Sequence, residues 1–384
     1  MSLITRLLQY KIFLICINLV LLAFILFFGF QPFAFNPENK VSRLRNSHGV
    51  STHDSVLIYE TDEEKDGGLL NNLSPMTIET AVIPFQEKQA RLSAILCFYD
   101  EREPELLMVA KWKSELILRR RIKRPHGSYA YHEIGIPNAF IINKTSFITI
   151  TTGICGTTIY INGKKAGVFP RYILDSRSEN NLKTRIMLGN DPQLKTPWNG
   201  EIRGLAIYGS ALTAGDISSH VNRWSEQDFI SLSKESGIIA LYPMNEKSGP
   251  YLNNVLTRKN NLYIPNNLFT IKKTVLRCPR DYFTRTHHFC PDLVLNVIGF
   301  IPLGFFLLAL LVSLFGKSNN QLVIITIICG SAISLTIELI QAFMPLRSSD
   351  LMDLFSNTVG TIIGVVLFRV IYCKYCKKIK GGLL

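Results

Sequence analysis

Four long apolar segments constrain this chain more than any other feature. Residues 12–30, 294–315, 322–343 and 355–373 hold 19 to 22 residues each and almost no charge. At about 1.5 Å rise per residue, a helix of this length crosses a hydrocarbon core of about 30 Å. The sequence therefore predicts a protein that spans a membrane four times. Residues 31–292 contain no such segment and are expected to fold outside the bilayer.

Basic residues at the two ends of the chain predict its orientation. Arg6 and Lys11 precede the first apolar segment, and residues 374–384 carry four lysines. The positive-inside rule places both termini in the cytoplasm. Since four spans return the chain to its starting side, residues 31–292 are expected on the opposite side. The first segment is expected to remain as an anchor, because its apolar run is longer than that of a signal peptide.

The formal net charge of +13 partly reflects this basic tail. A basic exterior favours anionic glycans or lipid headgroups as partners, and an ordinary mixed surface explains the same charge. The run Arg119, Arg120, Arg121, Lys123 and Arg124 is expected to be solvated at a strand end. No nucleic-acid-binding motif accompanies it, so a nucleic-acid partner is not predicted.

Polar residues recur at helical spacing in the last two spans. Intervals of three and four residues keep side chains on one face of a helix. The two series are Ser331, Ser334, Glu338 and Gln341, and then Asp350, Asp353, Asn357, Gly360 and Gly364. Ionisable groups inside a membrane cost several kcal/mol unless they are paired or hydrated, so they often mark a functional site.

The predicted topology collects these polar groups at one membrane face. The second span begins, the third ends and the fourth begins on the outer side. The expected outward-facing polar pocket contains Asp292, Asn296, Glu338, Gln341, Arg347, Asp350, Asp353 and Asn357. Arg347 is expected to pair with Asp350 or Glu338, or to hold a phosphate or carboxylate. The alternative is a buried network that only locks the helices together.

A second set of residues is predicted to shape the helix contacts. Small residues let membrane helices approach closely, and a proline inside a helix kinks it. The predicted packing residues are Gly299, Pro302, Gly304, Gly360 and Gly364.

The middle of the chain alternates apolar and polar residues over short runs, which is typical of β-strands. Asn162-Gly163 is a strong signal for a hairpin turn, and Thr213 with Asp216 predicts the start of a helix over 212–224. The expected strands are 77–84, 92–99, 106–111, 116–122, 146–152, 157–161 and 202–208. Many short strands with turn signals predict an all-β sandwich.

The eight cysteines suggest different roles. Cys97 and Cys155 lie in strand-like runs and are expected to be buried thiols. Cys278 and Cys290 flank a polar segment and can close a disulfide loop in an oxidising compartment. A metal site with the adjacent histidines matches no standard zinc spacing, so the disulfide is favoured over a metal, and unpaired thiols remain an alternative.

Three phrases in the middle of the chain resemble the laminin-G-like, concanavalin A-like sandwich family. Residues 146–169 read SFITITTGICGTTIYINGKKAGVF, residues 185–190 read RIMLGN, and residues 198–217 read WNGEIRGLAIYGSALTAGDI. The resemblance implies a jelly-roll sandwich that binds a glycan or a surface protein. Members sometimes bind calcium, so calcium is kept as an expectation and no other cofactor is predicted. Residues 238–249 resemble the first strand of such domains, although they lie near the C-terminal end of this one. They are expected to close the sandwich from that side.

Catalysis by the sandwich is not favoured. A glycosidase needs two opposed carboxylates in a cleft, whereas Asp175, Glu179, Asp191 and Glu201 are scattered and are expected to be solvated loop charges. Trp198 and Trp224 are expected in the core. These features favour a binding module.

The polar pattern of the last three spans resembles the bacterial VanZ-like membrane family. The resemblance rests on Asp292, Asn296, the GFIPLG of residues 299–304, Glu338-x-x-Gln341, Pro345, Arg347, Asp350, Asp353, Asn357, Gly360 and Gly364. It implies a multi-pass protein of the bacterial plasma membrane, and the family's namesake is associated with resistance to the glycopeptide teicoplanin. The large inserted sandwich departs from the family pattern.

The sequence as a whole predicts a four-helix transmembrane bundle and an extracytoplasmic β-sandwich. The expected regions are an anchor (1–31), a sandwich (55–250), a linker (251–290), a VanZ-like region (291–373) and a cytoplasmic tail (374–384). The expected function is that of a cell-envelope protein that binds an envelope glycan or surface protein and a lipid-linked component. The alternative is a membrane enzyme that acts on a lipid headgroup, or on an acyl or phosphoryl group, through Glu338, Asp350 and Asp353.

Overall fold

The fold is taken from a computed structural model of the chain. It describes residues 10–45, 47–54, 56–61, 70, 73–85, 92–123, 129–174, 182–257, 259–277, 291–316 and 318–381. These residues form two compact units. Unit 1 comprises residues 1–35 and 273–384, and unit 2 comprises residues 36–272.

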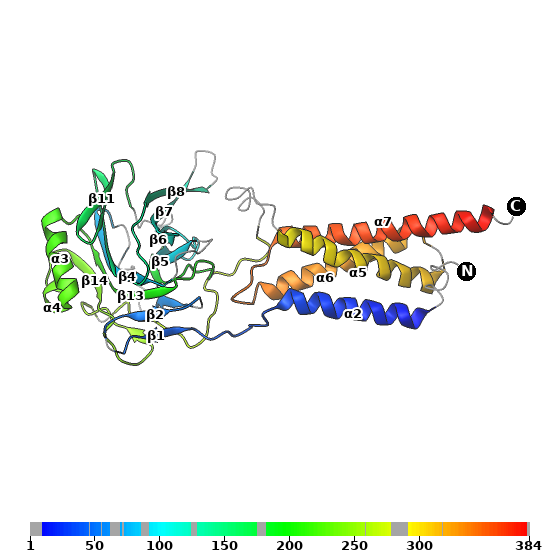
Figure 1. The fold of residues 1–384 in the computed structure, drawn as a ribbon, viewed down its shortest axis with the longest axis horizontal. Coiled ribbons are helices and arrows are strands. Elements are labelled where there is room, and N and C mark those ends of the chain that lie inside the picture. The colour runs from blue at the N-terminus through cyan, green and yellow to red at the C-terminus, as the bar shows by residue number, and fades with distance from the viewer. Residues whose placement is uncertain are drawn as a thin grey trace. The chain divides into compact units, whose positions relative to one another are not determined.

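Unit 1 is a bundle of four helices. They are α2 (Lys11–Phe30), α5 (Pro291–Phe315), α6 (Asn320–Gln341) and α7 (Leu351–Gly381). Each is long and apolar enough to cross a membrane, as the sequence predicts. The start of α2 and the end of α7 lie at the same end of the bundle (Figure 1). The helix α5 runs through Pro302 without a break in the assigned helix.

The described residues of unit 2 form two sheets in which every strand pair is antiparallel. The first sheet contains, in spatial order, β1 (Val41–Arg43), β2 (Val50–Thr52), β13 (Gly200–Tyr208), β4 (Met76–Pro84), β9 (Ser146–Gly153), β10 (Gly156–Ile161) and β11 (Lys164–Phe169), with β14 (Ile238–Tyr242) also paired to β13. The second contains β15 (Tyr251–Leu252), β16 (Leu262–Tyr263), β3 (Ile58–Glu60), β12 (Arg185–Leu188), β5 (Ser93–Tyr99), β6 (Leu107–Trp112), β7 (Glu115–Lys123) and β8 (Tyr129–Ile136). The predicted β-sandwich is confirmed.

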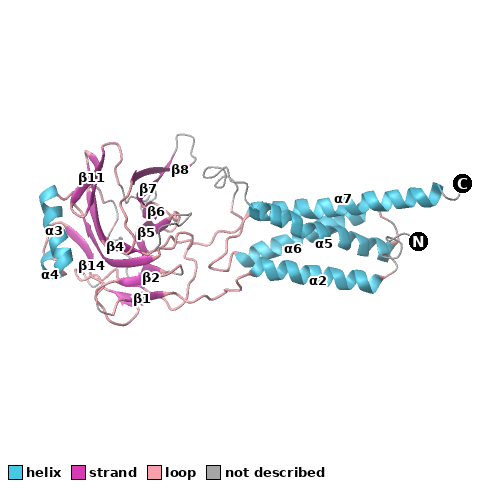
Figure 2. Cartoon of the chain, in the orientation of Figure 1, coloured by secondary structure: helices cyan, strands magenta, loops and turns pink. Residues whose placement is uncertain are grey.

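Three apolar layers hold unit 2 together. The main core lies between the sheets and contains the fully buried Trp198. A second layer packs α3 (Ala214–Glu226) and α4 (Phe229–Leu232) onto the outer face of the first sheet through Trp224, and Figure 2 shows both helices beside β14. A third layer covers part of the second sheet with Leu268 and Ile271. The core positions predicted for Trp198 and Trp224 are confirmed.

Local signals in the sequence correspond to structure at three places. Asn162 and Gly163 form the two-residue turn between β10 and β11, with φ of 52° and 76°, as a type I′ hairpin requires. Thr213 caps α3 in a reciprocal pair with Asp216. The segment expected at residues 238–249 begins with β14, which pairs with β13.

Three expectations are wrong. Arg119 is buried and pairs with Glu105 and Glu133, because cross-strand carboxylates neutralise the basic run on β7. Of the four acids expected as solvated loop charges, Asp191 is buried, because its carboxylate accepts backbone hydrogen bonds within its own turn. Glu201 lies in β13 and pairs with Arg203. Asp175 and Glu179 lie outside the described residues. Cys155 is exposed, because it lies in the turn between β9 and β10. Cys97 is buried, as predicted.

Candidate functional site

The predicted polar residues of the membrane helices lie at one end of unit 1. At this end α2 and α6 finish and α5 and α7 begin. Main-chain bonds shape the connection from α6 to α7: Met344 donates to the carbonyl of Gln341, and Arg347 donates to that of Met344. Two successive tight turns therefore return the chain into α7.

Glu338 is one of two almost fully enclosed acids of this cluster, with 2% of its surface exposed, compared with 1% for Asp350. Its Oε2 accepts a hydrogen bond of 2.6 Å from the backbone N–H of Asp350. The Ser349 side chain lies near the same carboxylate. The Glu338 carboxylate on α6 therefore accepts a hydrogen bond from the backbone that leads into α7. The first N–H groups of a helix lack intrahelical partners, so this bond satisfies a group at the start of α7.

Side-chain amides connect the remaining helices. Asn296 of α5 donates to Asp353 of α7 at 2.9 Å. Asn357 of α7 donates to the hydroxyl of Ser334 on α6, also at 2.9 Å. The helical spacing of the polar series therefore brings three helices into one network, as the sequence predicts they should meet.

Two donors reach α2. Gln341 donates to the carbonyl of Gly29 at 2.6 Å, and Arg347 donates to the same oxygen at 3.3 Å. The expectation that Arg347 pairs with Asp350 or Glu338 is not met within the described residues, because the guanidinium contacts the Gly29 carbonyl near the end of α2 instead. Sequence spacing gives no signal for a backbone acceptor, so Gly29 was missed.

Residues 276 and 277, which precede the undescribed residues 278–290, contact the same end of the bundle. Leu276 donates to Ser349 Oγ at 3.1 Å. Arg277 and the start of α7 exchange main-chain bonds, from Arg277 to Ser349 at 3.0 Å and from Leu351 to Arg277 at 3.2 Å. The connection between α6 and α7 is therefore paired with a second piece of chain.

Two predictions about the residues near the start of α5 lie outside what the structure describes. The proposed disulfide cysteines, Cys278 and Cys290, and the histidines beside them fall in an undescribed segment. Asp292 belongs to α5, but its side chain is not described. Within the described part of the chain, no group of three or more His, Cys, Asp or Glu side chains is arranged to hold a metal ion.

Glycines set the distance between α5 and α7. A Cβ at Gly360 would clash with the carbonyl of Val297, and one at Gly364 with that of Ile301. Gly304 faces Thr361 in the same way. Gly299 differs from the prediction for this set, because a Cβ there would meet no atom within 4 Å.

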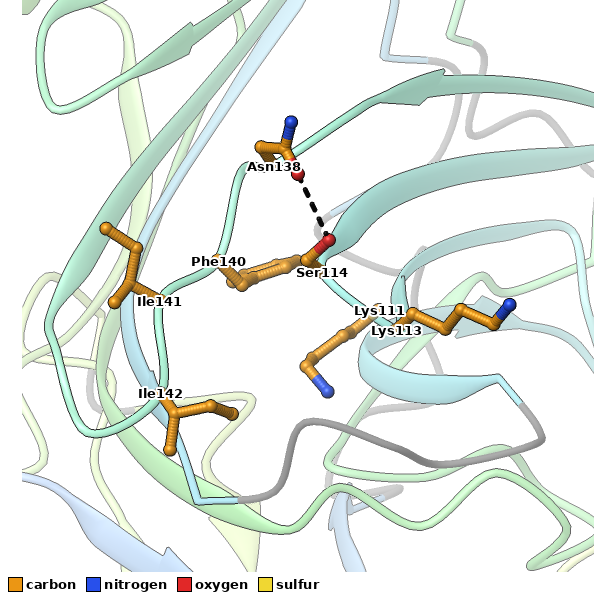
Figure 3. Close-up of a pocket in the computed structure, with 7 residues that line it drawn as sticks. All are labelled: Lys111, Lys113, Ser114, Asn138, Phe140, Ile141 and Ile142. Atoms are coloured by element: carbon orange, nitrogen blue, oxygen red, sulfur yellow. Dashed lines mark hydrogen bonds between the residues drawn. The ribbon is translucent and has the colours of Figure 1, made fainter.

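Unit 2 has a hollow of about 500 Å³ where the β6–β7 turn meets the loop after β8. Its lining residues are Lys111, Lys113, Ser114, Asn138, Phe140, Ile141 and Ile142. Ser114 donates to Asn138 at 3.4 Å, and the two lysine side chains point in different directions (Figure 3). Among the described residues, no carboxylate belongs to the lining.

Three tyrosines form a row across one edge of the second sheet. Tyr251 faces Tyr263, and Tyr263 faces Tyr59, in direct cross-strand register. Their ring centroids are 5.2 and 5.9 Å apart, and Phe269 lies 5.7 Å from Tyr59. Tyr251 and Phe269 are 38% and 41% exposed. Burial, followed by the neighbouring phenols, raises the pKa of Tyr59.

Two buried acids of unit 2 carry unpredicted polar networks. Glu79 accepts from Tyr208 and Trp224, each at 3.2 Å, and contacts His220 at 3.1 Å. Glu60 accepts from the backbone of Ile186 and the side chain of Asn260. Burial raises the pKa of Glu60 to about 7, although these hydrogen bonds and nearby Lys183 oppose the rise. Neither acid stands out in its strand-like sequence.

Comparison with protein families identifies both parts of the chain. Residues 225–372 match the VanZ/LLP1 family. Residues 112–218 match the concanavalin A-like lectin/glucanases superfamily, in its laminin G-like form. A comparison with the curated proteins gives no match.

Three solved structures illustrate what unit 2 is similar to. A native heptameric SAP-like pentraxin from Limulus polyphemus is 12% identical, with a TM-score of 0.33, and the match covers 47% of this chain and 79% of that chain. Domain 4 of the arabinanase AbnA from Geobacillus stearothermophilus, in complex with arabinotriose, is 15% identical, with a TM-score of 0.34, over 48% and 85%. The CBM40 of the Ruminococcus gnavus IT-sialidase, bound to sialyllactose, is 12% identical, with a TM-score of 0.37, over 49% and 99%.

The two family matches correspond in part to the two units, although the VanZ/LLP1 match begins at residue 225, inside unit 2. Three of the four apolar helices, α5, α6 and most of α7, lie within the match to the VanZ/LLP1 family, together with the polar residues at one end of the bundle. The two packed antiparallel sheets accompany the match to the lectin superfamily. The chain is therefore a membrane protein that combines a VanZ-like region with a laminin G-like, concanavalin A-like β-sandwich.

Proposed function

We propose that this protein acts in the bacterial cell envelope, where its sandwich binds an envelope glycan and the polar end of its helices binds a lipid-linked envelope component. Both termini lie in the cytoplasm in this proposal. Because unit 2 lies between α2 and α5 in the chain, four spans then put it on the outer side of the plasma membrane, together with the polar end.

The observation that supports the membrane part most is the buried Glu338 carboxylate in a network that contacts all four helices. Helix association in membranes needs only small residues and a few amides or hydroxyls. Acids inside membrane segments are costly and are usually retained for function. The polar end is therefore better explained by a ligand than by packing alone.

The tyrosine row is the proposed glycan surface of the sandwich. Partly exposed tyrosines offer flat apolar faces for sugar rings and hydroxyls for hydrogen bonds. Full-length protein in detergent, tested on a glycan array, should bind at least one envelope glycan. Replacing both Tyr251 and Tyr263 by alanine should remove that binding, whereas Lys113→Ala, in the hollow, should leave it unchanged. The reverse pattern would assign binding to the hollow.

The family resemblance supports a finer proposal, a role in resistance to teicoplanin. Deleting the gene in its host should lower the teicoplanin concentration that the cells tolerate. Restoring the wild-type chain should recover tolerance, and restoring Glu338→Gln at equal protein level should not. Unchanged tolerance after deletion would remove the resistance role and leave the binding proposal to the array.

One contact favours the alternative, a membrane enzyme. The Ser349 hydroxyl lies beside the Glu338 carboxylate, as a nucleophile lies beside its base. Ser349 also accepts from Leu276 and is buried, which suits a structural role. A fluorophosphonate probe that labels the wild-type chain but not Ser349→Ala would support the enzyme.

Calcium binding by the sandwich, which the family resemblance leads us to expect, is tested by comparing the Tm of the protein in calcium with its Tm in a chelator.

A further inference from the structure

Cations and exposed apolar side chains share the surface at the polar end of unit 1. Val275, Phe343 and Leu346 are 50%, 65% and 40% exposed, and Lys273 and Arg347 are exposed as well. These five residues, here called the basic rim, come from the two pieces of chain that pair at Ser349. The main-chain pairing therefore holds the rim in one layer.

The two cations of the basic rim are held by groups other than carboxylates. The Lys273 ammonium lies 4.6 Å from the centre of the Phe343 ring. The Arg347 guanidinium donates a hydrogen bond to the carbonyl of Gly29. Within the described residues, neither forms an ion pair, because the nearest acid of α6, Glu338, takes backbone and hydroxyl donors. Both cations therefore keep donors for an anion.

The end of α2 indicates the level of this rim in the membrane. The helix is an apolar span of 20 residues that ends at Phe30. Where such a span ends, the hydrocarbon core gives way to the headgroup layer. Since Arg347 contacts Gly29, one residue before that end, the guanidinium lies at that level.

We propose that the basic rim binds the phosphate of an anionic lipid headgroup. A guanidinium presents a planar fork of donors to phosphate oxygens, and an ammonium adds a second positive charge. The exposed Phe343 and Leu346 contact the acyl chains next to that headgroup. This inference rests on the proposed function and names phosphate as the recognised part of the lipid-linked component.

The test uses the full chain in detergent, titrated with short-chain phosphatidylglycerol and with the matching diacylglycerol, which lacks the phosphate. Native mass spectrometry counts the bound lipid. The wild-type chain should prefer phosphatidylglycerol. Replacing Lys273 and Arg347 together by glutamine should lower the affinity for phosphatidylglycerol by about tenfold, since charge-assisted bonds to phosphate are lost. The affinity for diacylglycerol should stay unchanged.

The matched control is Lys11→Gln, which removes an exposed cation at the other end of α2 and should behave as wild type. Equal binding of the two lipids by the wild-type chain, or wild-type affinity in the double variant, would overturn the proposal. If the double variant misfolds, the salt dependence of lipid binding by the wild-type chain tests the proposal instead. Phosphatidylglycerol affinity should fall as ionic strength rises, and a salt-independent affinity would overturn the proposal too.

The outcome is separable from that of the proposed function. A double variant that still binds a sugar-carrying polyprenyl diphosphate as wild type does would reject the basic rim and keep the lipid-linked component. Loss of glycan binding in the tyrosine variants would leave the basic rim untouched.

Discussion

The carboxylate of Glu338 accepts a hydrogen bond of 2.6 Å from the backbone N–H of Asp350. Glu338 lies in the last turn of α6, and Asp350 immediately precedes α7. The bond therefore fixes the start of one membrane helix against the end of another. It also occupies an acid that would otherwise pair with Arg347, so the same contact shapes both the bundle and its surface charge.

Substitutions of Glu338 should separate its contribution to the stability of the helix bundle from its contribution to binding the lipid-linked component. Glu338→Ala removes the acceptor of a buried N–H, which costs roughly 1–3 kcal/mol, so its Tm in detergent should fall. Glu338→Gln keeps an acceptor and should fold close to wild type, yet should bind the lipid-linked component more weakly, because one of the two acceptor oxygens becomes a donor that can no longer accept from hydroxyl groups of that component. Wild-type binding by folded Glu338→Gln would show that the acid only joins the helices.

The glycine contacts between α5 and α7 should respond selectively to an added methyl group. Gly364→Ala places a Cβ against the carbonyl of Ile301, so the helices must separate, at a cost of about 1–3 kcal/mol. Gly299→Ala has open space around it and should be neutral or slightly stabilising. Thermal unfolding of the two variants in the same detergent gives the comparison, and equal destabilisation would contradict the packing described here.

Glu60 should make the stability of the sandwich depend on pH. Its pKa rises from 4.5 to about 7 on folding, so the folded state holds its proton more tightly than the unfolded state. The free energy of unfolding should therefore fall by about 3 kcal/mol as pH rises from about 4.5 to 7.

Glu60→Gln cannot titrate and should flatten this pH dependence. The stability of the variant relative to wild type should therefore be higher at pH 8 than at pH 4. Glu226→Gln, at an exposed position of α3, serves as the control and should follow the wild-type curve. Parallel curves for wild type and Glu60→Gln would mean that Glu60 does not titrate in this range.

The buried network at Glu79 should be costly to disrupt. Glu79→Leu leaves the donors of Tyr208 and Trp224 without their acceptor, and each orphaned buried donor costs about 1–3 kcal/mol. The single long bond from Thr149, at 3.4 Å, contributes less, so Thr149→Val should shift Tm far less than Glu79→Leu. Similar shifts for both variants would contradict this ranking.

Part of the fold was predictable because its signals are local. The seven expected strands lie where alternating residues were read, and the turn at Asn162 and the cap at Thr213 follow from backbone geometry of two to four residues. Strands such as β8 and β11 were missed. Lys164–Phe169 has no alternating apolar pattern, because most of its side chains are exposed at the edge of the sheet.

The membrane site was predictable only as a group of residues. Helical spacing placed Glu338, Asn357 and their neighbours on shared faces, and the number of spans placed them at one end. Their partners were not predictable. Glu338 contacts a backbone N–H, and Arg347 contacts the carbonyl of Gly29, which lies 318 positions away.

By itself, the sequence determined the four spans, the sandwich class and the face that carries the polar residues, because length, hydropathy and periodicity depend on neighbouring residues alone. The tertiary structure decided which donor meets which acceptor, which glycines touch another helix, and which charges are buried. Such contacts depend on where distant backbone atoms lie after packing, and side-chain order along the chain carries no record of those positions.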